Sequence, residues 1–353
     1  MTIHKIAVLP GDGIGTEIIS EGVKVLRRIE ELDATFKFEF EYFPWGSEYY
    51  LKTGEIMPKD GLDTLAKFDA IYFGACGTPG VPNSLSSSEF IIKIRRAFDQ
   101  YVNLRPARLM KGVTSSLRNG TPENINIIFI RENTEGEYTD SGSYLYAGTQ
   151  NELAMQNNVF SRRGCERVMR FAFELARKNK MHLTSITKSN AVNWTMCFWD
   201  KIFDEISKEY PDVQTYSCLV DAAAMYLVVE PQRFQVVVAS NLFGDILTDL
   251  GAGIAGGLGL GAGANLNPER TYPSLFEPIH GSAPDIAHEN IANPIATILA
   301  AGQMMDFLGY ERWAKKINDV CEQVIVEGKT LTPDLGGTAT TQQLGDAIIE
   351  KLK

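Results

Sequence analysis

Short apolar runs alternate along the chain with segments whose apolar residues recur every three or four positions. The runs are "KIAVLP", "FDAIYFGA", "INIIFI", "LTSITK", "VQTYSCLV" and "FQVVVAS". Each run is short enough for a buried strand, whereas residues 17–29, 164–179 and 193–210 have the apolar spacing of helices. From about residue 294 the pattern is mostly helical. Strands that alternate with helices predict an α/β fold with much parallel sheet.

A glycine-rich stretch, "LPGDGIGTE", lies between the first apolar run and the first helical pattern. Its glycines are Gly11, Gly13 and Gly15, so the spacing is G-x-G-x-G and not the G-x-G-x-x-G of a dinucleotide-binding loop. Asp12 lies within the stretch and would repel a phosphate. We therefore predict a tight turn from strand to helix and no Rossmann-type pyrophosphate site.

Length and charge narrow the class of protein. A chain of 353 residues can bury a large core, and a net charge of -10 disfavours nucleic acid or an anionic membrane as the main partner. A local cluster of arginines can still bind a small anionic substrate. Residues 251–264 are the one stretch that suggests a membrane, but the stretch is too short to span a bilayer and too rich in glycine to predict a helix.

The cysteines and the N-terminus predict a cytoplasmic protein. The cysteines are Cys76, Cys165, Cys197, Cys218 and Cys321. Their number is odd and no two are close in sequence, which is typical of reduced thiols and gives no zinc-binding spacing. A strand-like run begins almost at the N-terminus, so we expect no signal peptide.

Three aspartates follow strand-like runs. Asp245 and Asp249 are four residues apart in "SNLFGDILTDL", so a helix there would place both carboxylates on one face. Two negative charges on one face favour a bound cation, and the alternative is a pair of solvated aspartates near a helix N-terminus. Asp221 stands where another strand gives way to a helix. It would either complete an oxygen site for Mg²⁺ or Mn²⁺ or cap its own helix.

Basic residues gather near further strand ends. The arginines of "IIKIRRAFDQYVNLRPARL" are Arg95, Arg96, Arg105 and Arg108. Arg131 directly follows the run "INIIFI", at a place where a guanidinium group can bind a substrate carboxylate. Arg96 and Arg108 are equally compatible with a solvated surface. Lys188 ends "LTSITK", where a lysine either acts as a base or marks the exit of the strand into water.

Eight motifs together resemble the β-decarboxylating dehydrogenases, the family that includes isocitrate, isopropylmalate and tartrate/D-malate dehydrogenases. They are "LPGDGIGTE", "NLRPARL", "RENTEGEY", "TKSNA", "VDAAAM", "SNLFGDILTDL", "EPIHGSAPDIAHENIANPIA" and "TPDLGGTATT". The motifs run from Leu9 to Thr341 and cover nearly the whole chain. The resemblance implies an α/β fold of the isopropylmalate dehydrogenase type, with two domains around a central cleft and not a Rossmann fold.

The same resemblance implies how the chain is divided and assembled. A discontinuous cofactor-binding domain would comprise residues 1–100 and 256–353, and residues 101–255 would form a central domain for substrate, metal and dimerisation. The family implies a homodimer with shared active sites, in which Lys188 and Asp221 enter each site from the neighbouring subunit.

Site residues follow from the family motifs, position by position. The acid/base pair would be Tyr138 and Lys188. The substrate would be bound by Arg95, Arg105, Arg131 and Ser88. The metal ligands would be Asp221, Asp245 and Asp249. The cofactor would be held by His280, Gly281, Ser282, Ala283, Asp285 and Asn293.

The implied cofactors are NAD and Mg²⁺ or Mn²⁺, with K⁺ as a further candidate ion. Asp285 matches the position that accepts the ribose hydroxyls, and a carboxylate bonds to a free 2′-hydroxyl but repels a 2′-phosphate. We therefore expect NAD rather than NADP. The implied reaction is oxidation of a 2-hydroxy dicarboxylic acid at C2, followed by loss of CO₂ from the resulting β-keto acid.

The substrate depends on the helix that carries Arg95. Ser88, Ile91 and Ile92 precede Arg95 by seven, four and three positions and would share its face. Two isoleucines give no partner to a third carboxylate, but they suit isopropylmalate as well as smaller acids. The stretches "PWGSEYYLKTGEIMPKDG", "FDQYVNLRPARLM" and "ANLNPERTYPSLFEPIHGSAPD" look most like the tartrate/D-malate branch. The alternatives are a 3-isopropylmalate dehydrogenase of leucine biosynthesis and a non-catalytic regulatory subunit of the same fold.

Overall fold

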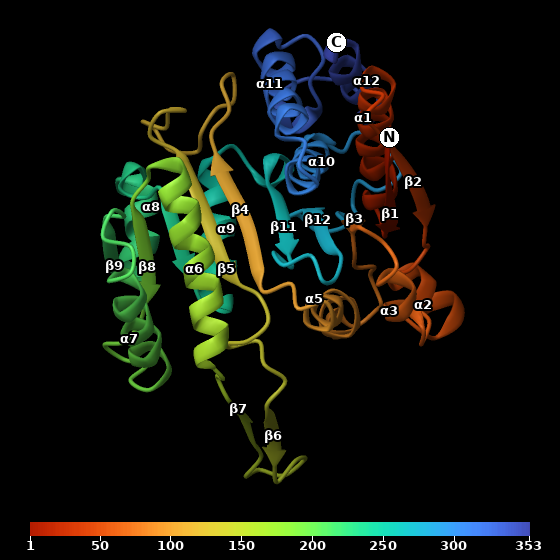
Figure 1. Ribbon diagram of the computed structural model, residues 1–353. Coiled ribbons are helices and arrows are strands. Elements are labelled where there is room, and N and C mark those ends of the chain that lie inside the picture. The colour runs from red at the N-terminus through yellow and green to blue at the C-terminus, as the bar shows by residue number, and fades with distance from the viewer.

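The computed structural model describes all residues 1–353 and contains one ten-stranded sheet with helices on both faces (Figure 1). In spatial order its strands are β2 (Phe36–Tyr42), β1 (Thr2–Gly11), β3 (Ala70–Ala75), β12 (Ser274–Pro278), β11 (Ala262–Leu266), β4 (Val102–Arg108), β5 (Asn126–Glu132), β10 (Val236–Ala239), β8 (Leu183–Thr187) and β9 (Thr215–Leu219). The predicted α/β fold is confirmed.

The sheet has two parallel ends and an antiparallel middle. Strands β2, β1, β3 and β12 are parallel to one another, as are β5, β10, β8 and β9. Between them, β12 pairs with β11, β11 with β4 and β4 with β5 in antiparallel fashion. All six apolar runs form strands, in β1, β3, β5, β8, β9 and β10. The polar middle strands β4 and β11 gave no comparable signal.

One face of the sheet carries a continuous core. Its helices are α1 (Gly15–Leu32), α6 (Arg162–Asn179), α7 (Thr195–Ser207), α10 (Ile295–Phe307), α11 (Glu311–Glu327) and α12 (Thr341–Lys351). Their apolar faces and the strands beneath them form a single cluster of 52 buried residues. Because this cluster spans both ends of the sheet, the burial of apolar surface holds the two ends together.

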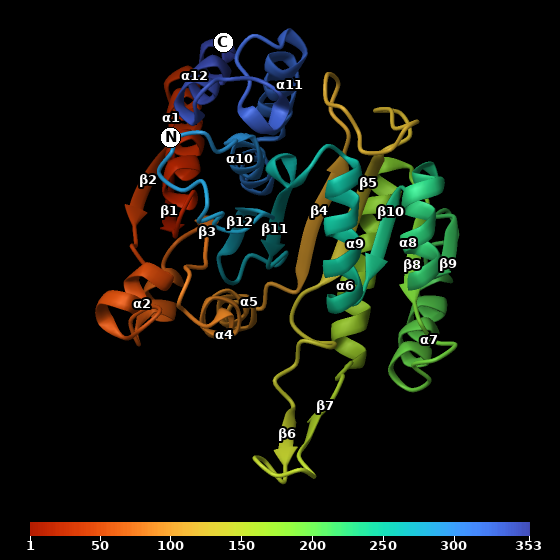
Figure 2. The same ribbon diagram turned by 180° about the vertical axis from the view of Figure 1, so that it is seen from behind.

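The opposite face carries two separate, smaller cores, as the view from behind shows (Figure 2). Its helices are α2 (Ser47–Thr53), α3 (Gly61–Leu65), α4 (Asn83–Ser86), α5 (Ile92–Ala97), α8 (Val220–Val229) and α9 (Asn241–Ile254). One cluster packs α5 on β1 and β3, and the other packs α8 and α9 on β5 and β10. The polar middle strands lie between these clusters, and this is where a pocket opens.

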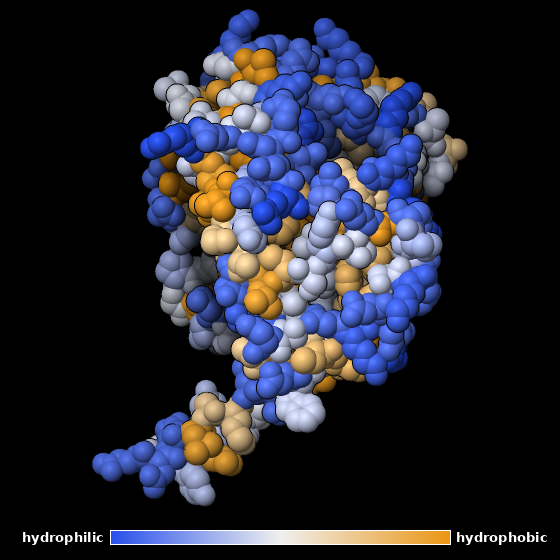
Figure 3. Space-filling model, turned by 90° about the vertical axis from the view of Figure 1, so that its left-hand side faces the viewer, coloured by the Kyte–Doolittle hydropathy of each residue, from blue (hydrophilic) through white to orange (hydrophobic).

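A hairpin projects from the body of the molecule (Figure 1, bottom). Its strands β6 (Gly142–Leu145) and β7 (Leu153–Gln156) form a separate antiparallel sheet, and all of their residues are exposed. The space-filling view shows the hairpin standing clear of the body, with apolar patches on it (Figure 3). Because its strand residues are all exposed, the hairpin buries little surface within the chain, and a two-stranded hairpin by itself is only marginally stable in water.

The glycine-rich stretch forms the predicted tight turn between β1 and α1. Gly13 has φ +55°, and a Cβ there would lie 2.3 Å from the carbonyl oxygen of Ser282. The carboxylate of Asp12 is buried and accepts the backbone N–H groups of Ser47, Glu48 and Gly77 at 2.8–2.9 Å. The turn therefore binds neighbouring protein segments where a Rossmann loop would bind phosphate.

The glycine-rich segment 251–264 is divided between elements. Its first four residues complete α9, against the expectation that so many glycines give no helix, and its last residues begin β11. Gly251 fits because its Cα approaches the ring of Phe129, where a Cβ would lie 2.8 Å away. No helix of the chain combines the length and the apolar character needed to cross a membrane.

Candidate active site

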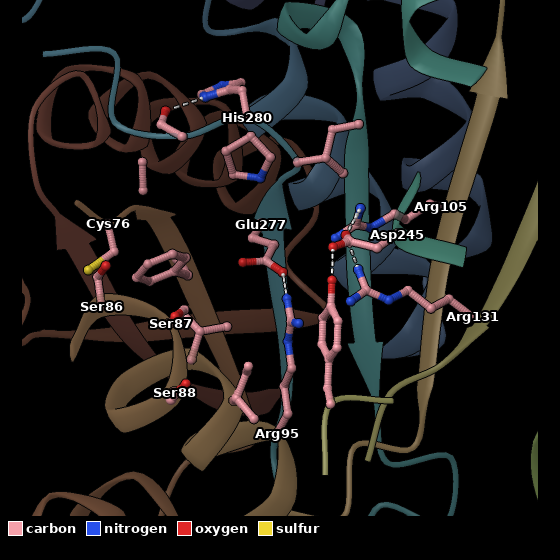
Figure 4. Close-up of a pocket in the computed structure, with 18 of the residues that line it drawn as sticks. Cys76, Ser86, Ser87, Ser88, Arg95, Arg105, Arg131, Asp245, Glu277 and His280 are labelled. Carbon is pink, nitrogen blue, oxygen red and sulfur yellow. Dashed lines mark hydrogen bonds and ion pairs between the residues drawn. The ribbon is translucent and has the colours of Figure 1, made fainter. Parts of the chain in front are cut away.

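A pocket of about 530 Å³ lies between α5 and α9, over the middle of the sheet (Figure 4). The side chains that line it come from segments far apart in the sequence, among them β3, α5, β4, β5, α9 and β12. The pocket brings together six residues that the sequence predicted to act together: Ser88, Arg95, Arg105, Arg131, Tyr138 and Asp245.

Arg131 is the most enclosed charge of the pocket. It is the penultimate residue of β5, its side chain is 1% exposed, and its guanidinium donates to Asn241 Oδ1 at 2.7 and 2.9 Å and to Asp245. The phenol of Tyr138 donates to the other oxygen of Asp245 at 2.5 Å. The carboxylate of Asp245 therefore accepts hydrogen bonds from both the guanidinium of Arg131 and the phenol of Tyr138.

Arg105 connects the pocket to the second aspartate of α9. From β4 it donates to Asn103 Oδ1 and Thr248 Oγ1, both at 2.9 Å. One of its nitrogens also lies 3.6 Å from Asp245 and 3.7 Å from Asp249. The two carboxylates lie one turn apart on α9, as predicted, and this buried guanidinium offsets part of their mutual repulsion.

Arg95 is held by an acid that the sequence reading did not single out. Its guanidinium pairs with Glu277 at 2.9 Å, and both side chains are about nine-tenths buried. The amide nitrogen of Asn265 donates to the same Glu277 oxygen at 2.7 Å. Asn265 in turn accepts from Asn103 at 2.8 Å and from Asn133 at 3.0 Å. A continuous buried network thus runs from Arg95 to Arg105.

Burial and these neighbouring charges shift the pKa values of Tyr138, Asp245 and Asp249. Burial, with the hydrogen bond to Asp245, raises the pKa of Tyr138 to about 12, so the phenol remains protonated at neutral pH. Burial alone would raise the pKa of the Asp245 carboxyl, but Arg131 and Tyr138 outweigh it and lower that pKa. Burial raises the pKa of Asp249, although Arg105 opposes the shift.

Ser88, Ile91 and Ile92 line the pocket beside Arg95. They reach it by a different geometry from the regular helix predicted, because residues 87–91 form a π-helical turn before α5. Ser86, Ser87 and Cys76 extend this wall, so hydroxyl groups and apolar surface alternate along it (Figure 4). Of the two arginines left open by the sequence, Arg96 donates to the carbonyl of Tyr138 and Arg108 pairs with Glu322.

Lys188 and Asp221 lie outside this pocket and pair with each other. Lys188 follows β8, Asp221 stands in the first turn of α8, and the two side chains meet at 2.7 Å. The lysine lowers the pKa of the aspartate. The three predicted aspartate ligands of one chain do not form a group that could hold a metal ion. In a single chain Asp245 lines the pocket, Asp249 lies one turn further along α9, and Asp221 lies elsewhere.

The predicted cofactor segment borders the pocket through His280 and Gly281. Burial lowers the pKa of His280, whose Nε2 is buried without a partner. Ser282 is tied to the glycine turn, since its carbonyl accepts the N–H of Ile14 at 2.9 Å. Asp285 is exposed. The remaining predicted positions are Ala283, with φ +39°, and Asn293, whose amide donates to Asp334 at 2.9 Å.

Several residues that shape the pocket were not predicted from the sequence. They are Glu277, Asn103, Asn133, Asn265, Asn241, Thr248 and Gln156. Most lie inside or beside the recognised motifs, for example Glu277 in "EPIHGS". A polar residue within a strand-forming segment was the available signal, because a buried polar side chain needs a partner.

Comparison with known proteins places this geometry in a family. The family model described as isocitrate/isopropylmalate dehydrogenase matches residues 5–348. A probable tartrate dehydrogenase/decarboxylase of Bacillus subtilis is 46% identical over 354 residues, which cover 100% of this chain and 99% of that protein. A D-malate dehydrogenase (decarboxylating) of Escherichia coli is 49% identical over 356 residues, 99% of this chain and 98% of that one. The crystal structure of isocitrate dehydrogenase from Methylococcus capsulatus superimposes with a TM-score of 0.88 at 36% identity, covering 99% of both chains.

Proposed function

The chain belongs to the isocitrate/isopropylmalate dehydrogenase family, and from that premise we propose that it oxidises and decarboxylates D-malate or tartrate, with NAD and a divalent metal ion. It is an oxidoreductase that acts on CH–OH groups, a decarboxylating dehydrogenase of hydroxy acids. The observation that carries the finer proposal is the group of three arginines that faces Tyr138 and Asp245 in one pocket.

Charge balance supports a dicarboxylate substrate. The guanidinium groups of Arg95, Arg105 and Arg131 are matched by the carboxylates of Glu277, Asp245 and Asp249. A dicarboxylate that enters together with a divalent cation leaves this balance unchanged. A tricarboxylate would leave one negative charge without a partner in a largely buried site, which is costly.

The wall beside Arg95 supports a small group at C3 of the substrate. Ser86, Ser87 and Ser88 offer hydroxyls that suit a hydroxyl or hydrogen at C3. Ile91 and Ile92 would also suit the alkyl group of 3-isopropylmalate, which remains the second candidate substrate. The relatives named for tartrate and D-malate, at 46% and 49% identity, favour the first reading.

The donor set fits a hard divalent cation. Asp249 has a side chain that is 60% exposed and turned toward Arg105, and Asp245 lies one turn before it. Carboxylate oxygens are the ligands that Mg²⁺ and Mn²⁺ prefer. We assign Asp245 and Asp249 of one chain and Asp221 of a second copy to the metal. A metal bound there would polarise the oxygens of the substrate, and bound NAD⁺ would supply the hydride acceptor.

The chain's own residues supply the remaining steps. Arg95, Arg105 and Arg131 orient the substrate carboxylates by paired hydrogen bonds. Lys188 of a second copy accepts the proton of the 2-hydroxyl group as the alcohol becomes a ketone. Tyr138, protonated at neutral pH, donates a proton to the carbon from which CO₂ has departed. Removal of free metal by a chelator should abolish turnover, whereas full activity of metal-free protein would contradict this assignment.

Exposed apolar surface supports a homodimer with shared sites. On α8, Met225, Val228 and Val229 are half exposed, and so is Ile246 on α9. Figure 3 shows apolar patches on the side of the molecule where β9 and α8 lie. Large exposed apolar patches mark interaction sites, and a second copy on this surface would bring its Lys188–Asp221 pair toward α9.

Five free thiols are consistent with a reducing compartment, the cytoplasm.

The cofactor preference rests on Asp285, which is exposed and has no arginine or lysine among its sequence neighbours. His280 adds a buried nitrogen without a partner, available to a bound nucleotide. We expect kcat/KM to be higher with NAD than with NADP. Asp285→Ser should narrow the difference in kcat/KM between the two cofactors, because it weakens the binding of NAD and relieves the repulsion of the 2′-phosphate of NADP. Equal kcat/KM values of the wild-type protein for NAD and NADP would overturn the assignment.

Turnover of D-malate and tartrate tests the function as a whole. With Mn²⁺ and NAD, the purified protein should form NADH and CO₂ in equal amounts from D-malate. A regulatory subunit would bind ligands without turnover of any hydroxy acid. Formation of NADH without release of CO₂ would show that the protein oxidises the hydroxy acid but does not decarboxylate the product, and would contradict the proposed decarboxylation.

A further inference from the structure

Three glutamates, one at the end of β5 and two in the loop that follows it, have different partners. Glu132 accepts the N–H groups of Thr134 and Glu135, at 2.9 and 2.8 Å, and so folds the loop on itself. Glu135 accepts the N–H and hydroxyl of Ser161, at 2.8 and 2.7 Å, at the start of α6. Glu137 reaches the start of α9, which carries Asp245 and Asp249.

Glu137 caps α9 from outside the helix. One of its oxygens accepts the hydroxyl of Ser240 at 2.8 Å and the other accepts the N–H of Leu242 at 3.1 Å. Ser240 is the residue before the helix, and its own side chain makes no capping bond to α9. The first N–H groups of a helix have no partner within it, and a negative charge there is stabilised by the helix dipole.

The next residue, Tyr138, bonds to the same helix one turn further on, at Asp245. Two consecutive residues of the loop therefore fix α9 at two points. The helix has little freedom between these points, because a Cβ on Gly244 would lie 2.6 Å from Cγ of Arg131. The main chain of Glu137 is itself anchored, since its carbonyl accepts the amide of Gln156 at 2.7 Å.

We propose that Glu137 is a positioning residue, whose carboxylate holds the first turn of α9 so that Asp245 stays in register with Tyr138 and Arg131. This inference rests on the proposed function, in which Tyr138 and Asp245 act on the substrate and the metal. Glu137 is buried, with 8% of its surface exposed, and it acts through the helix without lining the pocket.

Glu137→Ala, Glu137→Gln and Glu135→Ala test the proposal. Glu135 is the matched control, since its carboxylate bonds to Ser161, the N-cap residue of α6, a helix that carries no residue of the site. Glu137→Ala should lower kcat by about 10- to 100-fold, because small displacements of reacting groups cost that much, while KM for NAD changes less than about threefold. Glu137→Gln keeps an acceptor for the N–H of Leu242 and should restore most of kcat. Glu135→Ala should keep kcat near the wild-type value.

Amide hydrogen exchange gives a readout that does not depend on activity. In Glu137→Ala the N–H of Leu242 loses its acceptor, so exchange in residues 241–245 should rise at least about tenfold, with no such rise there in Glu135→Ala. Equal kcat values for the two alanine variants, or unchanged exchange at the start of α9, would overturn the proposal. A wild-type protein without turnover would instead overturn the proposed function, and the exchange measurement would still decide the role of Glu137.

Discussion

Asn265 determines how Arg95 is presented to the pocket. Its amide nitrogen donates to Glu277, the acid that pairs with Arg95, and its amide oxygen accepts from Asn103 and Asn133. The side chains of this network are all buried: Asn103, Asn133, Asn265 and Glu277. A buried polar group without a partner costs free energy, so replacing one donor by an acceptor in this network should disturb the pairing of Arg95 with Glu277.

Asn265→Asp makes that single change. A carboxylate would replace the amide nitrogen that lies 2.7 Å from Glu277, and the two like charges would repel each other and compete for Arg95. We expect KM for the hydroxy acid to rise about tenfold, or roughly 1.4 kcal/mol, with a smaller change in kcat. Initial rates at varied substrate concentration measure this. The control is Asn267→Asp, a buried asparagine that bonds to Asp99 away from the pocket and should leave KM unchanged.

The five thiols should differ in reactivity because they differ in burial. Burial raises the pKa of Cys165 and of Cys321 to about 12, and burial together with Asp12 does the same for Cys76. Because only the thiolate reacts, these thiols should be inert at pH 8 in the folded protein. Cys197 is exposed and should react first with a disulfide reagent. Rapid modification of Cys76, although it lines the pocket, would contradict the described environment.

At the scale of elements, the contact of α9 with β5 sets the geometry of the site. Gly244 allows this contact, because any side chain there would meet Arg131. Gly244→Ala should push the helix away from β5, displace Asp245 and lower kcat/KM by about 10- to 100-fold. Gly253→Ala on the same helix meets no atom within 4 Å and should leave activity unchanged. It should raise stability by up to about 1 kcal/mol, as measured by denaturant unfolding.

The elements that the sequence predicted are those whose apolar pattern is regular. The runs before Arg131, Lys188, Asp221 and Asp245 all formed strands. Lys188, Asp221 and Asp245 follow strand ends as predicted, whereas Arg131 lies within β5, which extends to Glu132. The middle strands β4 and β11 were not predicted, because "NLRPAR" and "AGANL" carry the buried polar side chains that join Arg95 to Arg105. The hydrogen-bond partners of these side chains lie up to 162 residues away in the chain. Only the folded structure shows such pairs.

For the molecule as a whole, the proposed mechanism requires two copies of the chain for each site. Tyr138 and Asp245 lie in the pocket, whereas Lys188 and Asp221 pair outside it, on the side where α8 exposes apolar residues. Complementation tests this separation. Tyr138→Phe and Lys188→Ala should each be nearly inactive alone, since every site of either homodimer carries one lesion.

Co-expression of the two variants should restore activity. In a mixed dimer one site carries both lesions and the other carries none, so random assortment should give about a quarter of the wild-type rate. A mixture that stays inactive, although mixed dimers are present by mass spectrometry, would place Lys188 in the same site as Tyr138 of its own chain or remove it from the reaction.

The comparison of kcat/KM for D-malate and for 3-isopropylmalate tests the proposed substrate of the enzyme. A pocket built for the isopropyl group gains roughly 2–3 kcal/mol from burying its three carbons, which is a factor of about 30 to 150 in kcat/KM. The hydroxyls of Ser86, Ser87 and Ser88 offer no such gain, although Ile91 and Ile92 could contact an alkyl group. The relatives named for tartrate and D-malate favour the smaller substrate, so D-malate should match or exceed 3-isopropylmalate when both are measured with NAD and Mn²⁺. A preference of about tenfold or more for 3-isopropylmalate, equivalent to roughly 1.4 kcal/mol, would contradict the account and assign the enzyme to that substrate instead.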